Sequence, residues 1–167
     1  MLRDFLTFEF FSPGPLPSRF GEVALGSYRR AGMIRGDFVL SQRIFEVKVI
    51  SGFAAAHNLK NFRGKCENLH GHNWKIEVAL RGTSLEDNGI LMDFGEVKQA
   101  VREAVEELDH KHLNELPFFE DNNPSSENIA RFIFDRLAER LNSESRRIHS
   151  VSAWESADAC ATYMEFL

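Results

Sequence analysis

The stretch Asn73–Arg81 reads Asn-Trp-Lys-Ile-Glu-Val-Ala-Leu-Arg, and it is the most regular part of the sequence. Its apolar side chains recur at every second position, at Trp74, Ile76, Val78 and Leu80. The positions between them are mostly charged, with Lys75, Glu77 and Arg81. Because successive side chains of a β-strand point to opposite sides, this alternation predicts a strand with one face on a core and the other in solvent.

Further strands and two helices are predicted on both sides of this stretch. Strands are expected over Arg43–Ile50, Ile90–Met92, Ile148–Glu155 and Thr162–Phe166. A first helix is expected to begin at Asp93, which forms a capping-box pattern with Glu96. A second helix is expected to open with Asn123 as its cap and Pro124 at its first position. The core stripe of this second helix comprises Ile129, Phe132, Ile133, Leu137 and Leu141.

The order of these elements predicts the fold class. Strands come first, two helices follow, and two strands close the chain, so helices and strands are segregated along the sequence. Such segregation is typical of an α+β fold with an antiparallel sheet. A chain of 167 residues, 43% of them apolar, is long enough for one domain with a core of its own.

Residues 1–41 differ in composition and are expected to form an irregular N-terminal extension to a domain over residues 42–167. They hold three of the five prolines, five of the eleven glycines and six of the fifteen phenylalanines. Two interpretations stay open. The extension is an arm that packs on the domain or on a partner, or the start codon was assigned too early and Met33 is the first residue. The sequence gives the extension no chemical role.

Charge and cysteine content exclude several classes of protein. A net charge of −5 argues against a nucleic-acid duplex or an anionic membrane as the main partner. Cys66 and Cys160 are the only cysteines, so a disulfide framework is excluded and a reducing compartment fits. The sequence has no secretory signal and no apolar run of about 18 residues, the length a membrane span needs. We therefore expect a cytoplasmic protein.

Three histidines form a candidate metal site. His70 and His72 are two residues apart and share one face of a strand, and Gly71 between them allows close approach. His57 follows the first predicted strand and returns beside them if the two strands pair as a hairpin. Three neutral imidazoles make a zinc site with an open fourth position, as in catalytic sites. Cys66 is either a fourth ligand, which would close the site, or a free thiol beside the metal.

The remaining polar residues give weaker signals. Asp109 and His110 could act as a proton relay, although an Asp-His dipeptide alone is common. His112 and His149 are interpreted as solvated residues, and Cys160 as a small buried one. Three basic residues could meet a triphosphate, but solvated loop charges are the commoner explanation: Lys60, Arg63 and Lys65.

Six segments of the sequence together resemble one known family. They are Phe53–His57, Lys65–Asn73, Gly89–Phe94, Leu108–Asn114, Asn123–Asn128 and Trp154–Ser156. In this order they resemble the 6-pyruvoyl-tetrahydropterin synthase / 6-carboxytetrahydropterin synthase family over residues 42–167. The resemblance implies a tunnelling fold (T-fold), with a four-stranded antiparallel sheet and two helices packed on one face. It also implies a homohexamer, a dimer of trimers, with active sites at subunit interfaces.

The resemblance assigns roles to individual residues. It implies one Zn²⁺ per subunit, held by His57, His70 and His72. Cys66 then corresponds to the catalytic thiol rather than to a ligand. Asp109 and His110 correspond to its relay partners, from a neighbouring subunit. Glu155 corresponds to the anchor of the pterin ring, and three residues complete the pterin pocket: Ser125, Ser126 and Glu127.

The resemblance also implies a reaction. The spacing from Cys66 to His70 matches the bacterial, carboxy-forming members of the family, which act toward queuosine and other 7-deazapurines. The expected lyase converts 7,8-dihydroneopterin triphosphate to 6-carboxy-5,6,7,8-tetrahydropterin, acetaldehyde and triphosphate. The alternative is 6-pyruvoyltetrahydropterin synthase activity on the biopterin route. A third subgroup carries Glu at the position of Cys66 and is disfavoured. A non-catalytic zinc- or pterin-binding module stays open as another class.

Overall fold

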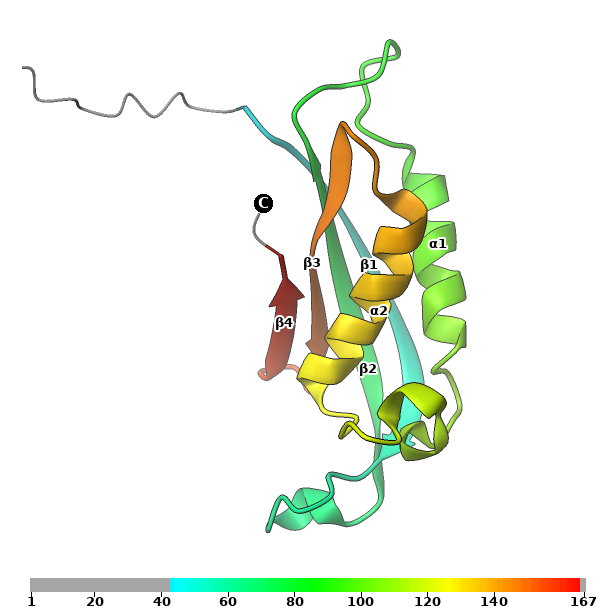
Figure 1. The fold of residues 1–167 in the computed structure, drawn as a ribbon, viewed down its shortest axis with the longest axis vertical. Helices are drawn as coiled ribbons and strands as arrows, with labels where there is room; N and C mark the ends of the chain where they lie inside the picture. Colours follow the sequence, from blue (N-terminus) through cyan, green and yellow to red (C-terminus); the bar gives the residue numbers. More distant parts are fainter. Residues whose placement is uncertain (1–42, 166–167) are drawn as a thin grey trace, which may run out of the picture. The chain divides into compact units, whose positions relative to one another are not determined.

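A computed structural model describes residues 43–165 of the chain (Figure 1). Its strands are β1 (Phe45–His57), β2 (His70–Gly82), β3 (Arg146–Trp154) and β4 (Cys160–Met164), and its α-helices are α1 (Phe94–Glu106) and α2 (Ser126–Leu141). Three short 3₁₀ helices lie in the connections: η1 (Lys65–Glu67), η2 (Leu113–Glu115) and η3 (Pro117–Phe119). The extension expected over residues 1–41 lies outside the described residues.

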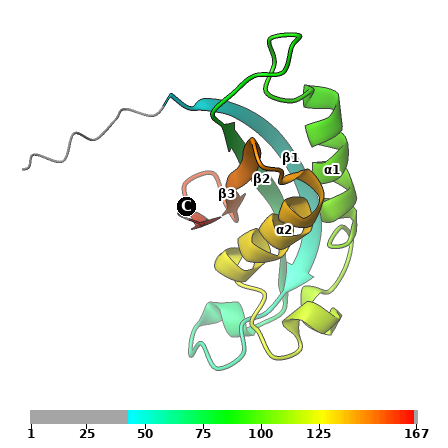
Figure 2. The ribbon, with the colours of Figure 1, turned by 45° about the horizontal axis from the view of Figure 1, so that its top comes forward.

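The four strands form one antiparallel sheet in the order β1-β2-β3-β4. β1 and β2 pair along their whole length, from Phe45 opposite Gly82 to His57 opposite His70. Both helices lie on the same face of the sheet, which Figure 2 shows from a second direction. The prediction of an α+β fold with two helices on one face of a four-stranded antiparallel sheet is confirmed.

The core lies between this face and the helices. The alternating residues of β2 are buried as predicted, and so is the whole stripe predicted for α2. β3 adds Ile148, Val151 and Ala153 to the same core. At the far edge, the Tyr163 ring of β4 packs 5.0 Å from the Phe134 ring of α2. Burial of these side chains on one face is the main favourable contribution to folding and fixes the helices over the sheet.

The two helices begin differently from one another. Asp93 caps α1 as predicted, since its carboxylate accepts hydrogen bonds from the backbone N–H groups of Gly95 and Glu96. The predicted start of α2 is wrong by two residues, because Ser125 is the cap and its Oγ accepts from Asn128 N. The Asn123 side chain instead bonds the backbone N–H and C=O of Lys60, at 2.7 and 3.0 Å. Asn123 therefore does not cap the helix, because its side chain is used in this long-range contact.

Two further predictions are wrong. Ile90–Met92 is not a strand, because Leu91 and Met92 bury their side chains in the core from a turn that leads into α1. A short apolar run alone does not distinguish a strand from a buried turn. Cys160 is exposed at the start of β4, so it is not a core residue.

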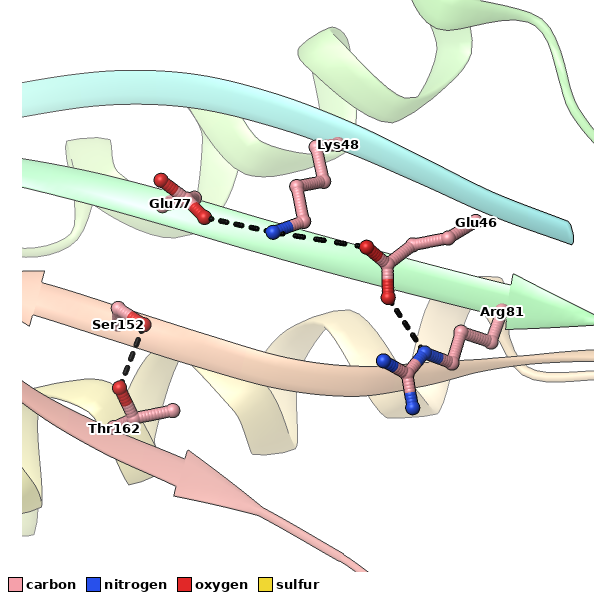
Figure 3. A network of polar contacts seen from close by, with 6 residues as sticks. All are labelled: Glu46, Lys48, Glu77, Arg81, Ser152 and Thr162. Carbon is pink, nitrogen blue, oxygen red and sulfur yellow. Dashed lines mark hydrogen bonds and ion pairs between the residues drawn. The ribbon is translucent and has the colours of Figure 1, made fainter.

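The face of the sheet away from the helices carries charged residues of β1 and β2 (Figure 3). The Lys48 ammonium lies 3.2 Å from the Glu77 carboxylate and 3.6 Å from that of Glu46, which also pairs with Arg81. On β3 and β4, the hydroxyls of Ser152 and Thr162 are 2.7 Å apart. The groups of this open-face network therefore pair with one another at the sheet surface. No helix among residues 43–165 is long and apolar enough to cross a membrane.

Candidate metal-binding and active site

The β1–β2 hairpin brings three histidines together at one end of the sheet. His57 pairs with His70, and Ala55 pairs with His72, so all three imidazoles lie on the helix-covered face. Their ring centroids are 4.5 to 5.3 Å apart. His57 is 1% exposed, and the other two are half-buried. The prediction that the hairpin brings His57 beside His70 and His72 is confirmed.

Two of these imidazoles are fixed by backbone carbonyls. The Nδ1 atom of His57 lies 2.7 Å from the Pro124 carbonyl, and that of His70 lies 2.8 Å from the Asn68 carbonyl. A carbonyl only accepts, so each Nδ1 carries a proton and each Nε2 presents a lone pair. The His57 Nε2 atom is buried without a hydrogen-bond partner, and burial lowers the pKa of His57, which favours the neutral imidazole.

This arrangement fits a divalent metal ion. Metal-binding histidines usually hold their second nitrogen on a carbonyl or carboxylate, which fixes the ring orientation. An orphaned buried Nε2 costs free energy unless a ligand satisfies it. The imidazole nitrogens of His57, His70 and His72 and a Glu155 carboxylate oxygen all lie within 4.8 Å of one another.

Glu155 follows β3 and joins this cluster from another part of the chain. One carboxylate oxygen, Oε1, lies 3.1 Å from His72 Nε2. The other, Oε2, accepts a hydrogen bond from Ser126 Oγ at 3.2 Å. The family resemblance assigns Glu155 to the pterin and does not predict its place beside the histidines. No local pattern could have predicted it, because the contact depends on how β3 and α2 meet the hairpin.

Cys66 lies in η1, on the loop that connects β1 to β2. It is half-buried, and its carbonyl accepts a hydrogen bond from Leu59 N at 2.7 Å, which closes the loop. Among the described residues, the ligand cluster contains Glu155 as its fourth member and does not contain Cys66. The structure thus places the thiol outside the group of converging ligand atoms.

Asp109 and His110 are hydrogen-bonded to the backbone of β1, at the edge of the sheet. His110 Nδ1 is 2.8 Å from Asp109 Oδ2, while Asp109 Oδ1 accepts from Ala54 N at 2.8 Å. His110 N donates to the Ala54 carbonyl, and His110 has a φ of 55°, which is uncommon for a residue other than glycine. The Ala54 N–H and the His110 side chain lower the pKa of Asp109. The carboxylate therefore stays ionised and orients the imidazole.

A shallow, open cavity of about 560 Å³ lies beside β1 and the segment that carries His110. His72 of the metal cluster and His110 of the relay pair both line it, together with Asn73 and His112. The prediction that His112 is solvated is wrong. It is half-buried, its Nδ1 lies 3.0 Å from Glu115, and its Nε2 is buried without a partner.

The other predicted residues are placed as follows. Ser126 contacts Glu155, whereas Ser125 caps α2 and Glu127 is exposed in its first turn. Three basic loop residues are exposed, namely Lys60, Arg63 and Lys65. His149 is half-buried rather than solvated, and burial lowers its pKa.

Comparison with known proteins identifies the family. Residues 46–165 match the family described as 6-pyruvoyl tetrahydropterin synthase. The chain belongs to this family. The resemblance inferred from the six sequence segments is therefore confirmed, and so is the expected enzyme class, a lyase of the tetrahydropterin synthase type.

Individual relatives carry two different names. A protein of Archaeoglobus fulgidus, named putative 6-carboxy-5,6,7,8-tetrahydropterin synthase, is 40% identical over 94 residues, which are 56% of this chain and 76% of the relative. The 6-pyruvoyl tetrahydrobiopterin synthase of Poecilia reticulata is 34% identical over 115 residues, 60% of this chain and 78% of that one. The solved structure of Caenorhabditis elegans 6-pyruvoyl tetrahydropterin synthase superimposes with a TM-score of 0.67 at 26% identity, over 77% of this chain and all of that chain.

Proposed function

We propose that this protein is a zinc-dependent lyase that converts 7,8-dihydroneopterin triphosphate to 6-carboxy-5,6,7,8-tetrahydropterin, acetaldehyde and triphosphate, in queuosine or 7-deazapurine biosynthesis. The observation that carries the proposal is the convergence of the His57, His70 and His72 imidazoles with the Glu155 carboxylate, whose ligand atoms all lie within 4.8 Å of one another. In this proposal Asp109 and His110 are supplied to each site by a neighbouring subunit, as the family resemblance implies.

The zinc ligands in this proposal are His57, His70 and His72, with one ion per subunit. The donor set supports the assignment, since zinc takes neutral imidazole nitrogens. The carbonyls of Pro124 and Asn68 leave the Nε2 atoms of His57 and His70 free to bind it. When bound, zinc supplies Lewis-acid polarisation of the substrate's side-chain hydroxyls and a template for them.

The protein's own groups then move the protons. Cys66, as a thiolate, removes or returns a proton on the polarised side chain. His110 exchanges protons at the other side-chain positions. The ionised Asp109 holds the Nδ1 proton of His110, so Nε2 is the atom that faces the substrate. In this division of labour Cys66 and His110 are catalytic residues, and Asp109 positions His110.

Recognition of the pterin is assigned to Glu155. The pterin edge presents an N–H and an NH₂ group side by side, and a carboxylate accepts both in a bidentate pair. Ser126 lies within hydrogen-bond distance of this carboxylate, which supports a place at the pocket. Ser125 and Glu127 flank Ser126 at the start of α2 and complete the proposed pocket.

An oligomer is part of the proposal, because the site is open in a single subunit. The His110 side chain is 82% exposed, and Ile50 on the open sheet face is 61% exposed. A hexamer built as a dimer of trimers would cover such groups and complete each site from a neighbour. We also propose a cytoplasmic location, because the two free cysteines, Cys66 and Cys160, fit a reducing compartment.

A second candidate is 6-pyruvoyltetrahydropterin synthase, which the relative from Poecilia reticulata and the Caenorhabditis elegans structure favour. The spacing Cys66-x-x-x-His70 favours the carboxy-forming reaction. The two differ in whether the side chain is split.

Product analysis tests the proposal. The zinc-loaded protein is incubated with dihydroneopterin triphosphate, and acetaldehyde and the pterin products are quantified. We expect acetaldehyde and 6-carboxytetrahydropterin in equal amounts. Triphosphate release with an intact pyruvoyl side chain would instead establish the second candidate. Absence of turnover with one tightly bound zinc per subunit would leave the non-catalytic binding module.

A further inference from the structure

The Glu155 carboxylate lies within the histidine cluster rather than extended toward solvent. It is one of four groups whose ligand atoms converge within 4.8 Å. Both of its oxygens are engaged, because Oε1 faces His72 Nε2 at 3.1 Å and Oε2 accepts from Ser126 Oγ at 3.2 Å. The carboxylate therefore lies against an imidazole of the cluster as well as against the start of α2.

The distance and the alignment of the contact between Glu155 and His72 match those of two ligands bound to the same ion. Although only 3.1 Å separates the two atoms, His72 Nε2 makes no aligned hydrogen bond. Two neighbouring ligands of a tetrahedral zinc ion lie about 3.3 Å apart, given bonds of about 2.0 to 2.1 Å. Two atoms whose lone pairs both point at one ion lie close together without forming a hydrogen bond with each other.

We propose that Glu155 is the fourth metal ligand in the substrate-free protein, and that pterin binding withdraws it. This inference rests on the proposed function and deepens it. Bidentate recognition of the pterin edge needs both carboxylate oxygens, and the structure has Oε1 on the histidine side and Oε2 on Ser126. The same carboxylate therefore closes the metal site at rest and opens a coordination position when the pterin takes it.

If Glu155 leaves the metal to bind the pterin, the affinities for metal and for pterin depend on each other. If the pterin removes a metal ligand, it weakens metal binding, and by linkage the metal weakens pterin binding by the same factor. The substrate's own side chain then occupies the vacated position, so only molecules with both parts are held well. A pterin without side-chain hydroxyls isolates the coupling, and 6-methylpterin is such a probe.

The first test measures the metal site without any pterin. The full-length protein is freed of metal by chelation and titrated with Co²⁺, and the visible d–d spectrum and the Kd are recorded. We expect Glu155→Gln to change the spectrum and to raise the Kd by at least about tenfold, the lower end of the effect of removing even an outer-shell partner. Circular dichroism confirms that the variant is folded.

Two further variants separate ligation from charge. Glu155→Asp keeps the charge but retracts the carboxylate, so it is expected to behave like Glu155→Gln. Glu144→Gln makes the same charge change in the exposed turn before β3, at the other end of that strand, and is expected to match the wild type. A wild-type spectrum and Kd in Glu155→Gln would overturn the assignment of Glu155 as a ligand. A normal Kd in Glu155→Asp would reduce its role to electrostatic attraction and overturn it as well.

The second test adds 6-methylpterin. We expect it to raise the Co²⁺ Kd of the wild type and to shift the spectrum toward that of Glu155→Gln, while the spectrum of Glu155→Gln stays unchanged. Binding of 6-methylpterin without any effect on the cobalt spectrum or Kd would overturn the exchange. A protein that binds no pterin would overturn both the exchange and the proposed function, whereas the first titration decides ligation independently.

Discussion

The β1–β2 hairpin carries two polar clusters that are built in opposite ways. On the open face, the charges of Glu46, Lys48, Glu77 and Arg81 pair with one another in contact with solvent (Figure 3). At the end of the hairpin, on the helix-covered face, His57 Nε2 and His72 Nε2 are buried without hydrogen-bond partners. The first cluster pairs its charges with one another, and the second leaves two ring nitrogens without a partner among the described residues.

The open-face network is expected to contribute to stability, and the histidine cluster to function. An exposed ion pair contributes about 0 to 1 kcal/mol, because solvent screens it. An unsatisfied buried polar atom costs about 1 to 3 kcal/mol, and a bound ligand that satisfies the atom removes this cost. Substitutions in the two clusters should therefore affect different properties, which the following experiments measure.

The largest effect is expected from Cys66→Ala. Removing the proposed catalytic thiol should lower kcat by about 10²- to 10⁴-fold, the contribution of a general acid–base group. Zinc content should remain at one per subunit, because Cys66 lies outside the ligand cluster. Steady-state kinetics and metal analysis measure both quantities. Cys160→Ala, at the exposed second cysteine, is the matched control and should change neither. Loss of one zinc equivalent in Cys66→Ala would make the thiol a ligand.

Asp109→Asn should have a smaller effect on turnover. The Asn oxygen can still accept from Ala54 N, so the loop should stay attached to β1. The neutral amide no longer holds the His110 imidazole as the carboxylate does, and we expect kcat to fall about 10²-fold at constant KM. Circular dichroism and pterin binding should match the wild type. Unchanged turnover would remove the relay pair from the mechanism.

The metal-free protein should lose stability in acid. Burial lowers the pKa of His57 in the fold below the value of about 6.5 in the unfolded chain. Between these two pKa values the unfolded chain binds a proton that the folded chain does not. The free energy of unfolding should therefore fall as the pH drops below about 6.5, by at most about 1.4 kcal/mol per pH unit for this residue.

Urea unfolding in the presence of a chelator, at a series of pH values, measures this slope. His57→Asn is the matched variant, since its amide can still donate to the Pro124 carbonyl. Its slope should be smaller than that of the wild type. Equal slopes would mean that His57 does not contribute to the pH dependence.

The smallest effect is expected in the open-face network. Glu46→Gln removes the carboxylate that contacts both Arg81 and Lys48. The hydrogen bond from Arg81 is the main cause that lowers the pKa of Glu46, and the charges of Arg81 and Lys48 add to it. After discounting for solvent screening, we expect a loss of less than about 1 kcal/mol in the free energy of unfolding. The loss should disappear in about 1 M salt. Urea titrations at low and high salt test this, and a large, salt-independent loss would contradict the distinction between the two clusters.

Much of the fold could be predicted because its signals are local. The alternation over Asn73–Arg81 predicts β2, and Asp93 marks the start of α1. Two of the wrong predictions concern residues whose surroundings are set by segments distant in the sequence. Asn123 caps no helix because its side chain bonds the backbone of Lys60, and Cys160 is exposed because it lies at the start of an edge strand.

The candidate site divides in the same way. The sequence by itself singled out the three histidines, because the spacing of His70 and His72 puts both on one face of a strand and His57 joins them if the two strands pair. Only the tertiary structure decided that the Pro124 carbonyl fixes His57, that Asp109 is held by Ala54, and that Glu155 meets His72. Periodicity reports which face a side chain occupies. It does not report which distant backbone or side chain faces it, since that depends on how helices and strands pack.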